Sequence, residues 1–292
     1  MIGSVLQLLI SGIAMGCIYG LVGIEYTLVW NSTGLINFAH DKLIMLGAYV
    51  FAGTFIVKMG VNPIIGVLAT LIVMFLFGSA VAIGIFNPLR NKPTIFAVMG
   101  TVLLGRVISE AVRLIWGPTP FTLPTFLHGI VHIGNIVVAT ANIWIIVVSA
   151  VLVIGLTIFF RTTRTGKAMR CVQHNKTAAA LMGIDVTRNI IFTIGLSAMV
   201  CTLIGILVIP LFTIDGTIGS MIGLKGFASG LVGGFGYLPG TVVGGIIIGI
   251  VENMSTIIIP ATYKDVVAFI LMVSFLLIEP SGLLGHGKNQ SR

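Results

Sequence analysis

The sequence predicts an all-α polytopic membrane protein with about eight transmembrane helices, between about seven and nine. Of its residues, 57% are hydrophobic and 8% are charged, whereas roughly a quarter of a soluble domain is charged. Mean hydropathy is +1.14. Apolar runs long enough to cross about 30 Å of hydrocarbon recur along the whole chain, and runs such as 61–86 are apolar on every face, which favours helices over membrane strands.

Each expected helix is an apolar run between polar or glycine-rich segments. The first lacks the basic start of a cleavable signal, because the first charge is Glu25, so we expect it to stay as a membrane helix. The run at 223–237 is short and rich in glycine, so it either crosses the membrane or dips into it and returns. The expected helices are 4–24, 34–57, 61–86, 94–116, 142–160, 189–210, 223–237, 240–258 and 264–279.

The distribution of basic residues predicts the topology. The polar segment 161–188 carries six basic residues and one acid, Asp185, so it should be cytoplasmic. Residues 117–141, which have no Lys or Arg, then lie outside, and Arg90 and Lys92 lie inside. The formal net charge of +8 is therefore explained by topology and not by nucleic-acid binding. Three crossings after residue 215 place the C-terminal tail inside, whereas a re-entrant 223–237 would reverse it.

Small residues recur at four-residue spacing in several of the expected helices. In lipid, such spacings allow close approach of helix backbones. The sequence therefore predicts tight helix packing, within or between subunits. The spacings are Gly12/Gly16/Gly20, Gly230/Gly234, Gly240/Gly244 and Gly245/Gly249.

The cytoplasmic segment contains a short helix of its own. Asn175 is suited to cap its N-terminus, residues 176–182 favour helix, and Gly183 is a natural stop. The result is a helix of about two turns. Such a projection can dock into a groove of another protein.

Two motifs give the chain a family resemblance. Residues 178–184, Ala-Ala-Ala-Leu-Met-Gly-Ile, resemble the coupling-loop motif by which ABC importer permeases contact their ATPase, with Gly183 at the motif's glycine. Residues 34–40, Gly-Leu-Ile-Asn-Phe-Ala-His, resemble the signature of branched-chain amino-acid permeases, and residues 249–253, 263–269 and 280–285 match the same family. The pattern resembles the shorter, LivH-type permease. It implies an ABC importer permease fold in which 1–292 form a single transmembrane domain, with a coupling loop at 161–188.

The resemblance also implies where function lies. The residues expected to couple to the ATPase are Arg164, Lys167, Asn175, Thr177, Ala178, Ala179, Ala180, Leu181, Met182 and Gly183. Polar groups inside a membrane usually face a cavity or a partner, so a translocation pathway is expected along Gly34, Asn37, Phe38, His40 and Asp41. The alternative for His40 is a packing role, with Asp41 and Lys42 marking the membrane edge.

Other charges in the apolar runs are expected to be structural. Arg106, Glu110 and Arg113 are spaced i, i+4 and i+7, which predicts two ion pairs within one helix. Glu252 should face protein or water, with Lys225 as a candidate partner.

The partners implied by the resemblance are a second, longer permease in a heterodimer, two cytoplasmic ATPases and an extracytoplasmic amino-acid-binding protein. The expected cargo is a branched-chain or other hydrophobic amino acid, and the expected location is the bacterial or archaeal cytoplasmic membrane. Gly166-Lys167 lacks the rest of a phosphate loop, so ATP and Mg are expected on the partner subunits. We find no catalytic, metal-binding or nucleic-acid-binding motif, and expect a transport subunit and not an enzyme.

The chain departs from the family pattern at three places. The family usually has glycine near Glu25, Gly-Glu or Gly-Asp in place of Asp41-Lys42, and arginine in place of Glu279. The first two departures bear on substrate choice or regulation. The leading alternative function is an ion-coupled secondary amino-acid transporter, in which Glu25, Asp41 and Glu252 would form an ion site.

Overall fold

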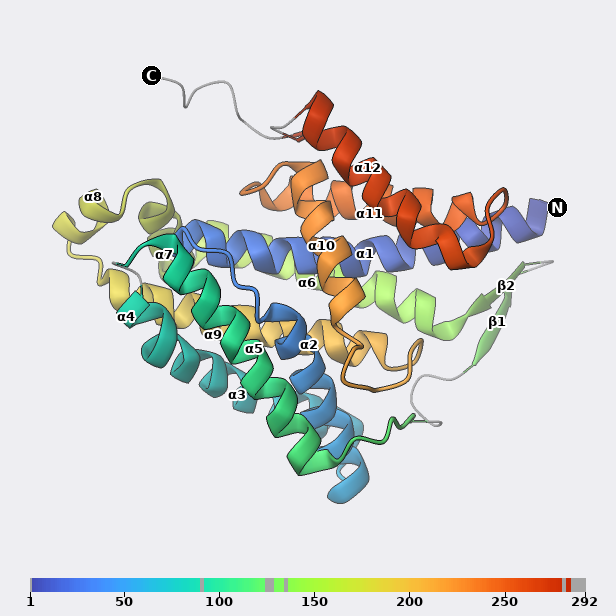
Figure 1. Cartoon of the computed structure of the whole chain (residues 1–292), viewed down its shortest axis with the longest axis horizontal. Coiled ribbons are helices and arrows are strands. Elements are labelled where there is room, and N and C mark those ends of the chain that lie inside the picture. The colour runs from blue at the N-terminus through green and yellow to red at the C-terminus, as the bar shows by residue number, and fades with distance from the viewer. Residues whose placement is uncertain (1, 90–91, 124–128, 134–135, 280–281, 285–292) are drawn as a thin grey trace. The chain divides into compact units, whose positions relative to one another are not determined.

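The computed structural model describes residues 2–89, 92–123, 129–133, 136–279 and 282–284, which are mainly helical (Figure 1). Short π-helical segments extend two of the helices, and residues 130–133 and 136–139 form an antiparallel hairpin in which Ile130 pairs with Ala139. The elements are α1 Ile2–Thr33, α2 His40–Tyr49, η1 Val50–Lys58, α3 Pro63–Val81, η2 Ala82–Phe86, α4 Asn87–Leu89, α5 Thr94–Trp116, β1 Ile130–Ile133, β2 Ile136–Ala139, α6 Thr140–Thr162, α7 Arg164–His174, α8 Lys176–Leu181, α9 Val186–Val208, α10 Ser220–Gly233, α11 Leu238–Ser255, η3 Ala261–Tyr263 and α12 Lys264–Ile278.

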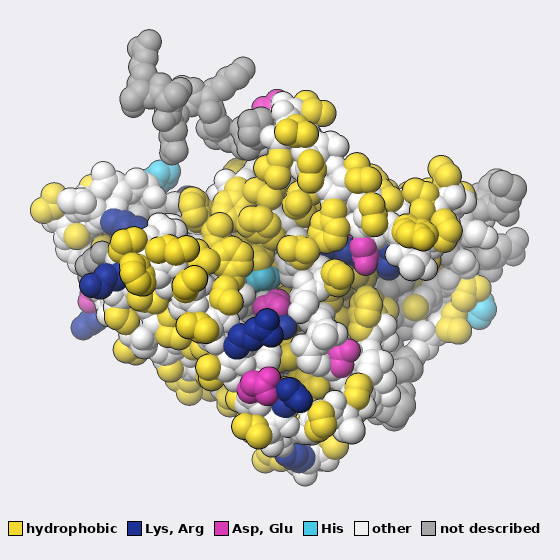
Figure 2. Space-filling model, viewed as in Figure 1, with side chains coloured by type: hydrophobic (Ala, Val, Ile, Leu, Met, Phe, Trp, Pro, Cys, Tyr) yellow, Lys and Arg dark blue, Asp and Glu magenta, His cyan; other side chains and the backbone are white. Residues whose placement is uncertain are grey.

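In the described part of the chain, 8 helical stretches are long and apolar enough to cross a membrane, as predicted. They are α1, α2 with η1, α3 with η2 and α4, α5, α6, α9, α11, and η3 with α12. Figure 2 shows hydrophobic side chains spread widely across the visible face, as expected for a surface in contact with lipid. The 14-residue α10 is about 21 Å long, too short to span about 30 Å of hydrocarbon by itself.

The chain folds into two compact units, each built from segments distant in sequence. Unit one contains residues 1–27, 124–152 and 221–292, and unit two contains residues 28–123 and 153–220. In unit two, α9 packs against both α2 and α3. In α9, 72% of the apolar stretch that could span a membrane is buried, more than in any other candidate span of the described residues. α9 is therefore the central helix of this unit.

Unit one is held by glycine-lined contacts between α1 and α11. A Cβ at Gly12 would lie 2.9 Å from the Gly249 carbonyl oxygen, and one at Gly20 would lie 3.0 Å from Val242 Cα. At Gly16 the nearest atom would be Ile246 Cα, at 2.6 Å. The predicted small-residue spacings therefore meet within the chain, and the two helices run antiparallel.

The direction of these helices bears on topology. α1 ends at Thr33, whose carbonyl oxygen accepts a hydrogen bond from Lys176 in the segment predicted to be cytoplasmic. Because α11 runs antiparallel to α1, it leads away from the side predicted to be cytoplasmic, and α12 returns, with Leu283 N–H donating to the Val232 carbonyl near the end of α10. α12 therefore ends on the side where α11 begins. Arg90, Pro280, Ser281, Gly285, Lys288 and Arg292 lie outside the described residues.

We expect Gly245→Ala to destabilise the protein and Gly155→Ala to leave it unchanged or slightly more stable. A Cβ at Gly245 would lie 2.6 Å from the Gly16 carbonyl oxygen, whereas one at Gly155 in α6 would meet no atom within 4 Å. Overpacking costs about 1–3 kcal/mol, while alanine is favoured over glycine in a helix by about 1 kcal/mol. The thermal midpoint of the detergent-solubilised protein measures this difference. Equal midpoints for the two variants would show that the α1–α11 contact is looser than described.

Several boundaries differ from the predicted ones. The first helix continues past residue 24 to Thr33, because Glu25 is fully buried and does not mark a membrane edge. It ends where Gly34 adopts φ +74°, and the next helix begins at His40 instead of residue 34. The hairpin and α7 were not predicted. Their segments are short or polar and lack the long apolar run that reveals a membrane helix.

Candidate coupling surface and translocation site

The loop predicted to be cytoplasmic contains an ordered pair of helices, α7 and α8. The Thr163 hydroxyl accepts a hydrogen bond from Gly166 N–H and caps α7. The Asn175 side chain accepts one from Ala178 N–H at 3.0 Å and caps α8. Gly183, with φ +83°, ends α8 in a conformation that favours glycine. These local contacts fix α8 as a projection at the start of α9 (Figure 1).

The two faces of α8 differ sharply. Ala179 is 0% exposed and faces the protein, whereas Leu181 is 85% exposed and Met182 is 67% exposed. Large apolar side chains presented at the tip of a polar loop are a typical protein-docking feature. Ala179, which the sequence placed among the docking residues, instead anchors the helix, since a two-turn helix must rest one face on its own protein. The other residues of the predicted coupling set are all exposed: Arg164, Lys167, Asn175, Thr177, Ala178, Ala180 and Gly183.

Lys176 joins this loop to the end of α1. Its Nζ donates to the Thr33 carbonyl oxygen at 2.7 Å, across a sequence separation of 143 residues. The last carbonyls of a helix lack partners within the helix and carry the negative end of its dipole, so a lysine there is stabilising. The hydrogen bond therefore links the start of α8 to the point where α1 ends.

Residues 34–39 form the break that follows α1. The Asn37 side chain accepts a hydrogen bond from Ala39 N–H at 3.0 Å, and its backbone oxygen lies 3.1 Å from His40 Nδ1. Phe38 N–H donates to Thr101 Oγ1 on α5. Asn37 and His40 are buried, while the Phe38 side chain is 43% exposed. The break is thus a turn held by hydrogen bonds within the protein.

A charged cluster lies at the start of α2. Lys42 Nζ is 3.1 Å from Asp41 Oδ2 and donates to Ser220 Oγ at 3.1 Å, and Ser220 Oγ donates to Asp41 Oδ2 at 3.2 Å. The Lys42 and Asp41 side chains are 19% and 18% exposed, so the cluster is open on one side.

The depth of this cluster in the membrane follows from α5. A Cβ at Gly105 would lie 3.3 Å from Lys42 Cγ. Gly105 is eleven residues into α5, about 17 Å from the N-terminus of a helix about 35 Å long, which is near its middle. The cluster therefore lies near mid-depth, where two helices, α2 and α10, begin. Broken helices that meet near the midplane are typical of transporter substrate pathways.

The outer face of α5 carries three charges. Arg113 Nη1 donates to both carboxylate oxygens of Glu110 at 3.2 Å, and both side chains are more than 60% exposed. Among the ion pairs of the described residues, none joins Arg106 to Glu110, so only one of the two predicted pairs forms. A cation N-terminal to an acid is the weaker order on a helix, and Arg113 already occupies the carboxylate.

In unit one, a second and more deeply buried cluster surrounds Lys225. Its Nζ is 2.7 Å from Glu252 Oε1 and 2.6 Å from Asp265 Oδ1. Tyr19 OH donates to Glu252 Oε2 at 3.0 Å, and Lys264 Nζ is 3.6 Å from Glu252 Oε1. Glu252 is 1% exposed, so it faces protein as expected, and four elements, α1, α10, α11 and α12, meet there.

Comparison with known proteins gives the family. A family model described as "Branched-chain amino acid transport system / permease component" matches residues 8–276. The high-affinity branched-chain amino acid transport system permease protein LivH of Escherichia coli is 32% identical, with 96% of each chain covered. The chain belongs to this permease family. The related protein BraD of Pseudomonas aeruginosa is also 32% identical over 96% of each chain.

The fold has a solved counterpart. A chain in the structure of PsaBC from Streptococcus pneumoniae in complex with Fab shares 15% identity with the permease, with a TM-score of 0.54, and 94% of the permease and 91% of that chain are covered. The permease is a multi-pass membrane protein and a transport subunit of an ABC transporter, and not an enzyme. As a subunit of this kind it works with ATPase and substrate-binding partners. Family membership supports ATP-driven import and not the ion-coupled alternative.

Sequence reasoning missed several residues of the permease that complete these sites. Ser220 and Lys176 act through contacts with distant segments, and Tyr19 and Asp265 complete the Lys225 cluster. The charge of Asp265, beside an apolar run, was a visible signal, whereas Lys176 is one of several basic residues in a polar segment. No sequence signal singles out Ser220.

Proposed function

We propose that the permease is one of two transmembrane subunits of an importer for branched-chain amino acids. It pairs with a related, longer permease and works with two cytoplasmic ATPases and one extracytoplasmic amino-acid-binding protein. The observation that carries the proposal is α8, an ordered helix that presents Leu181 and Met182 to the cytoplasm in a family whose relatives are branched-chain amino-acid permeases. Cargo selectivity rests largely with the binding protein.

The charged face of α5 supports a second transmembrane partner. Arg106 is exposed and lies twelve residues into α5, about 18 Å from its start and near its middle. A charge at this depth is costly in lipid, so such residues face protein or water. A neighbouring permease subunit, or the aqueous pathway between two subunits, supplies that surrounding for Arg106 and its neighbour Glu110.

The proposed mechanism runs along the contacts that lead from α8 to the end of α1 and the break at 34–39. When ATP binding closes the ATPase pair, α8 moves with it, and Lys176 transmits the movement to the end of α1 and the break at 34–39. The break leads directly to Asp41 and Lys42 at mid-depth, so their exposure to one side or the other changes with it. The coupling is thermodynamic, because nucleotide must bind the two conformations with different affinity.

The cluster at mid-depth suits an amino acid. The cargo carries an ammonium and a carboxylate, and Asp41 and Lys42 present the opposite charge for each group on one partly open surface. The nucleotide binds elsewhere: ATP and Mg belong to the partner ATPases, because the permease sequence lacks a phosphate loop.

We expect Lys176→Met to reduce transport much more than it reduces basal ATP hydrolysis by the assembled importer. The change removes a charge-assisted hydrogen bond of about 1.5–3 kcal/mol between α8 and α1, while it leaves the docking side chains in place. Lys92→Met, which removes another exposed lysine on the same side of the membrane, is the control. The ratio of amino acid transported to ATP hydrolysed measures the coupling. If both variants keep the normal ratio, Lys176 has no part in transmission.

Co-purification tests the proposed assembly. The permease is extracted from native membrane in mild detergent, and bound proteins are identified by mass spectrometry. We expect a second permease of the same family and an ATPase in fixed proportion. A homo-oligomer that transports without either protein would contradict the proposal.

A further inference from the structure

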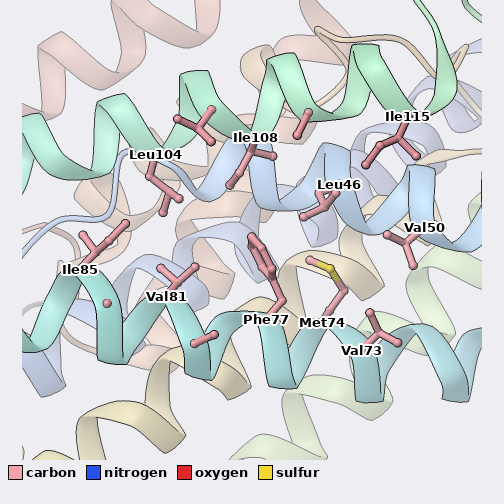
Figure 3. Close-up of a pocket in the computed structure, with 14 residues that line it drawn as sticks. Leu46, Val50, Val73, Met74, Phe77, Val81, Ile85, Leu104, Ile108 and Ile115 are labelled. Carbon is pink, nitrogen blue, oxygen red and sulfur yellow. The ribbon is translucent and has the colours of Figure 1, made fainter.

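Unit two contains an apolar groove separate from the charged sites. Its volume is about 510 Å³, and its walls come from α2, η1, α3, η2 and α5. Figure 3 shows Phe77 and Met74 pointing into it from α3, opposite Ile108 and Leu104 of α5. Every lining side chain is apolar, and the volume is that of a small-molecule site, about 300–1,000 Å³.

The groove is unsuited to the amino acid cargo. Leu104, Ile108, Ala111 and Ile115 line it from one face of α5. At 100° per residue, the charged residues Arg106, Glu110 and Arg113 lie on the other side of the helix. A zwitterion entering an apolar groove would lose its hydration without gaining partners. The occupant must therefore be apolar where it contacts the walls.

The length of the groove matches one leaflet of a membrane. Along α3 and η2 its lining runs from Val73 to Ile85, twelve residues apart and about 18 Å. Half of the hydrocarbon core is about 15 Å. Neighbouring residues on the outer faces, such as Ile72 and Leu103, are more than 60% exposed, so the groove adjoins lipid-facing surface.

The two ends of the groove differ in charge and access. Beyond Ile85, Leu89 packs against Gly100, where an added Cβ would lie 2.7 Å from its Cδ1, and this contact closes one end. At the other end Lys58 Nζ donates to the Ile115 carbonyl oxygen at 3.3 Å and lies 5.9 Å from the centroid of the Trp116 ring. Lys58 is exposed. Tryptophan and lysine are typical of the membrane–water interface, and this end leads to the segment predicted to be outside.

We propose that the groove holds one acyl chain of a phospholipid from the extracytoplasmic leaflet, with its phosphate bound by Lys58. The walls match the hydrocarbon, the length matches one leaflet, and the single ammonium stands at the level of the head group. The bound lipid fills the space between α3 and α5 and supports their packing on α2. This site is independent of the cargo and of the ATPase.

Photo-crosslinking tests the proposal on the assembled importer in nanodiscs. The probe is phosphatidylglycerol with a diazirine in its acyl chain, and labelled peptides are mapped by mass spectrometry. We expect labels to concentrate on groove residues such as Met74 and Phe77. Gly84→Leu and Ala111→Leu place side chains in the groove, and a Cβ at Gly84 meets no atom within 4 Å, so folding is preserved. Labelling should fall about tenfold, since losing contact with two methylenes has that effect.

The controls separate this site from general lipid contact. Gly155→Leu adds the same side chain on α6, where a Cβ also meets nothing within 4 Å, and should leave groove labelling unchanged. Lys58→Gln should lower labelling by phosphatidylglycerol toward that of a probe without net charge. The proposal would be overturned if the groove in Gly84→Leu and in Ala111→Leu were labelled as strongly as in the unchanged permease. Crosslinks from groove residues to the second permease would also overturn it, because a protein helix would then occupy the groove.

Discussion

We expect the replacement of Leu181 and Met182 together by glutamate to abolish substrate-stimulated ATP hydrolysis in the assembled importer and to leave membrane insertion intact. Both side chains are exposed at the tip of α8, so neither change disturbs the fold of the permease. Docking residues of this kind cost about 2–4 kcal/mol each when lost, and two negative charges add desolvation. A loss of 1.4 kcal/mol lowers affinity tenfold, so we expect the dissociation constant of the ATPase to rise at least about a thousandfold.

The matched control exchanges the same two side chains, Leu181→Met with Met182→Leu. It preserves the apolar docking face and should keep ATPase stimulation. Ala179→Arg would be a poorer test, because Ala179 is buried and its replacement would disturb α8 itself. Normal stimulation in the glutamate double variant would remove α8 from the coupling surface.

Lys225→Met is the second change with a large expected effect. It leaves Glu252, which is 1% exposed, without its closest cation, and it also removes a contact with Asp265. Removing one partner of a buried pair costs about 3–5 kcal/mol. Loss of stability should appear as a much lower thermal midpoint in detergent and a lower yield of folded protein. The double variant Lys225→Met with Glu252→Gln should recover part of the loss, because the uncompensated charge is gone.

The exposed ion pair between Arg113 and Glu110 on α5 provides the control for the stability effect of the Lys225 cluster. Arg113→Met breaks an ion pair whose side chains are 61% and 64% exposed, and such pairs contribute about 0–1 kcal/mol. Its thermal midpoint should stay near that of the unchanged protein. If Lys225→Met were as mild as Arg113→Met, the Lys225 cluster would be solvated and not a structural centre.

The parts of the fold that follow from local signals were predicted from the sequence. Apolar runs gave the number of membrane helices, and Asn175 with Gly183 gave both ends of α8, because caps and stops depend on residues three or four positions apart. The glycine spacing on α1 and α11 predicted close packing, although not that both helices belong to one chain.

Contacts between distant segments were not predictable. Ser220 meets Asp41 across 179 residues, and Tyr19 meets Glu252 across 233. A single sequence carries no record of such pairs. The predicted end of the first helix, at residue 24, was wrong for a related reason. Glu25 looks like a membrane boundary in the sequence, but tertiary packing buries it completely.

In the proposed mechanism, this permease conducts branched-chain amino acids under the control of ATP. The most direct measurement is uptake of radiolabelled leucine by proteoliposomes that contain the permease with its co-purified partners and the binding protein. We predict uptake that requires ATP on the ATPase side and stops when the permease is omitted. Uptake by the permease alone, driven by a sodium or proton gradient without ATP, would contradict the account.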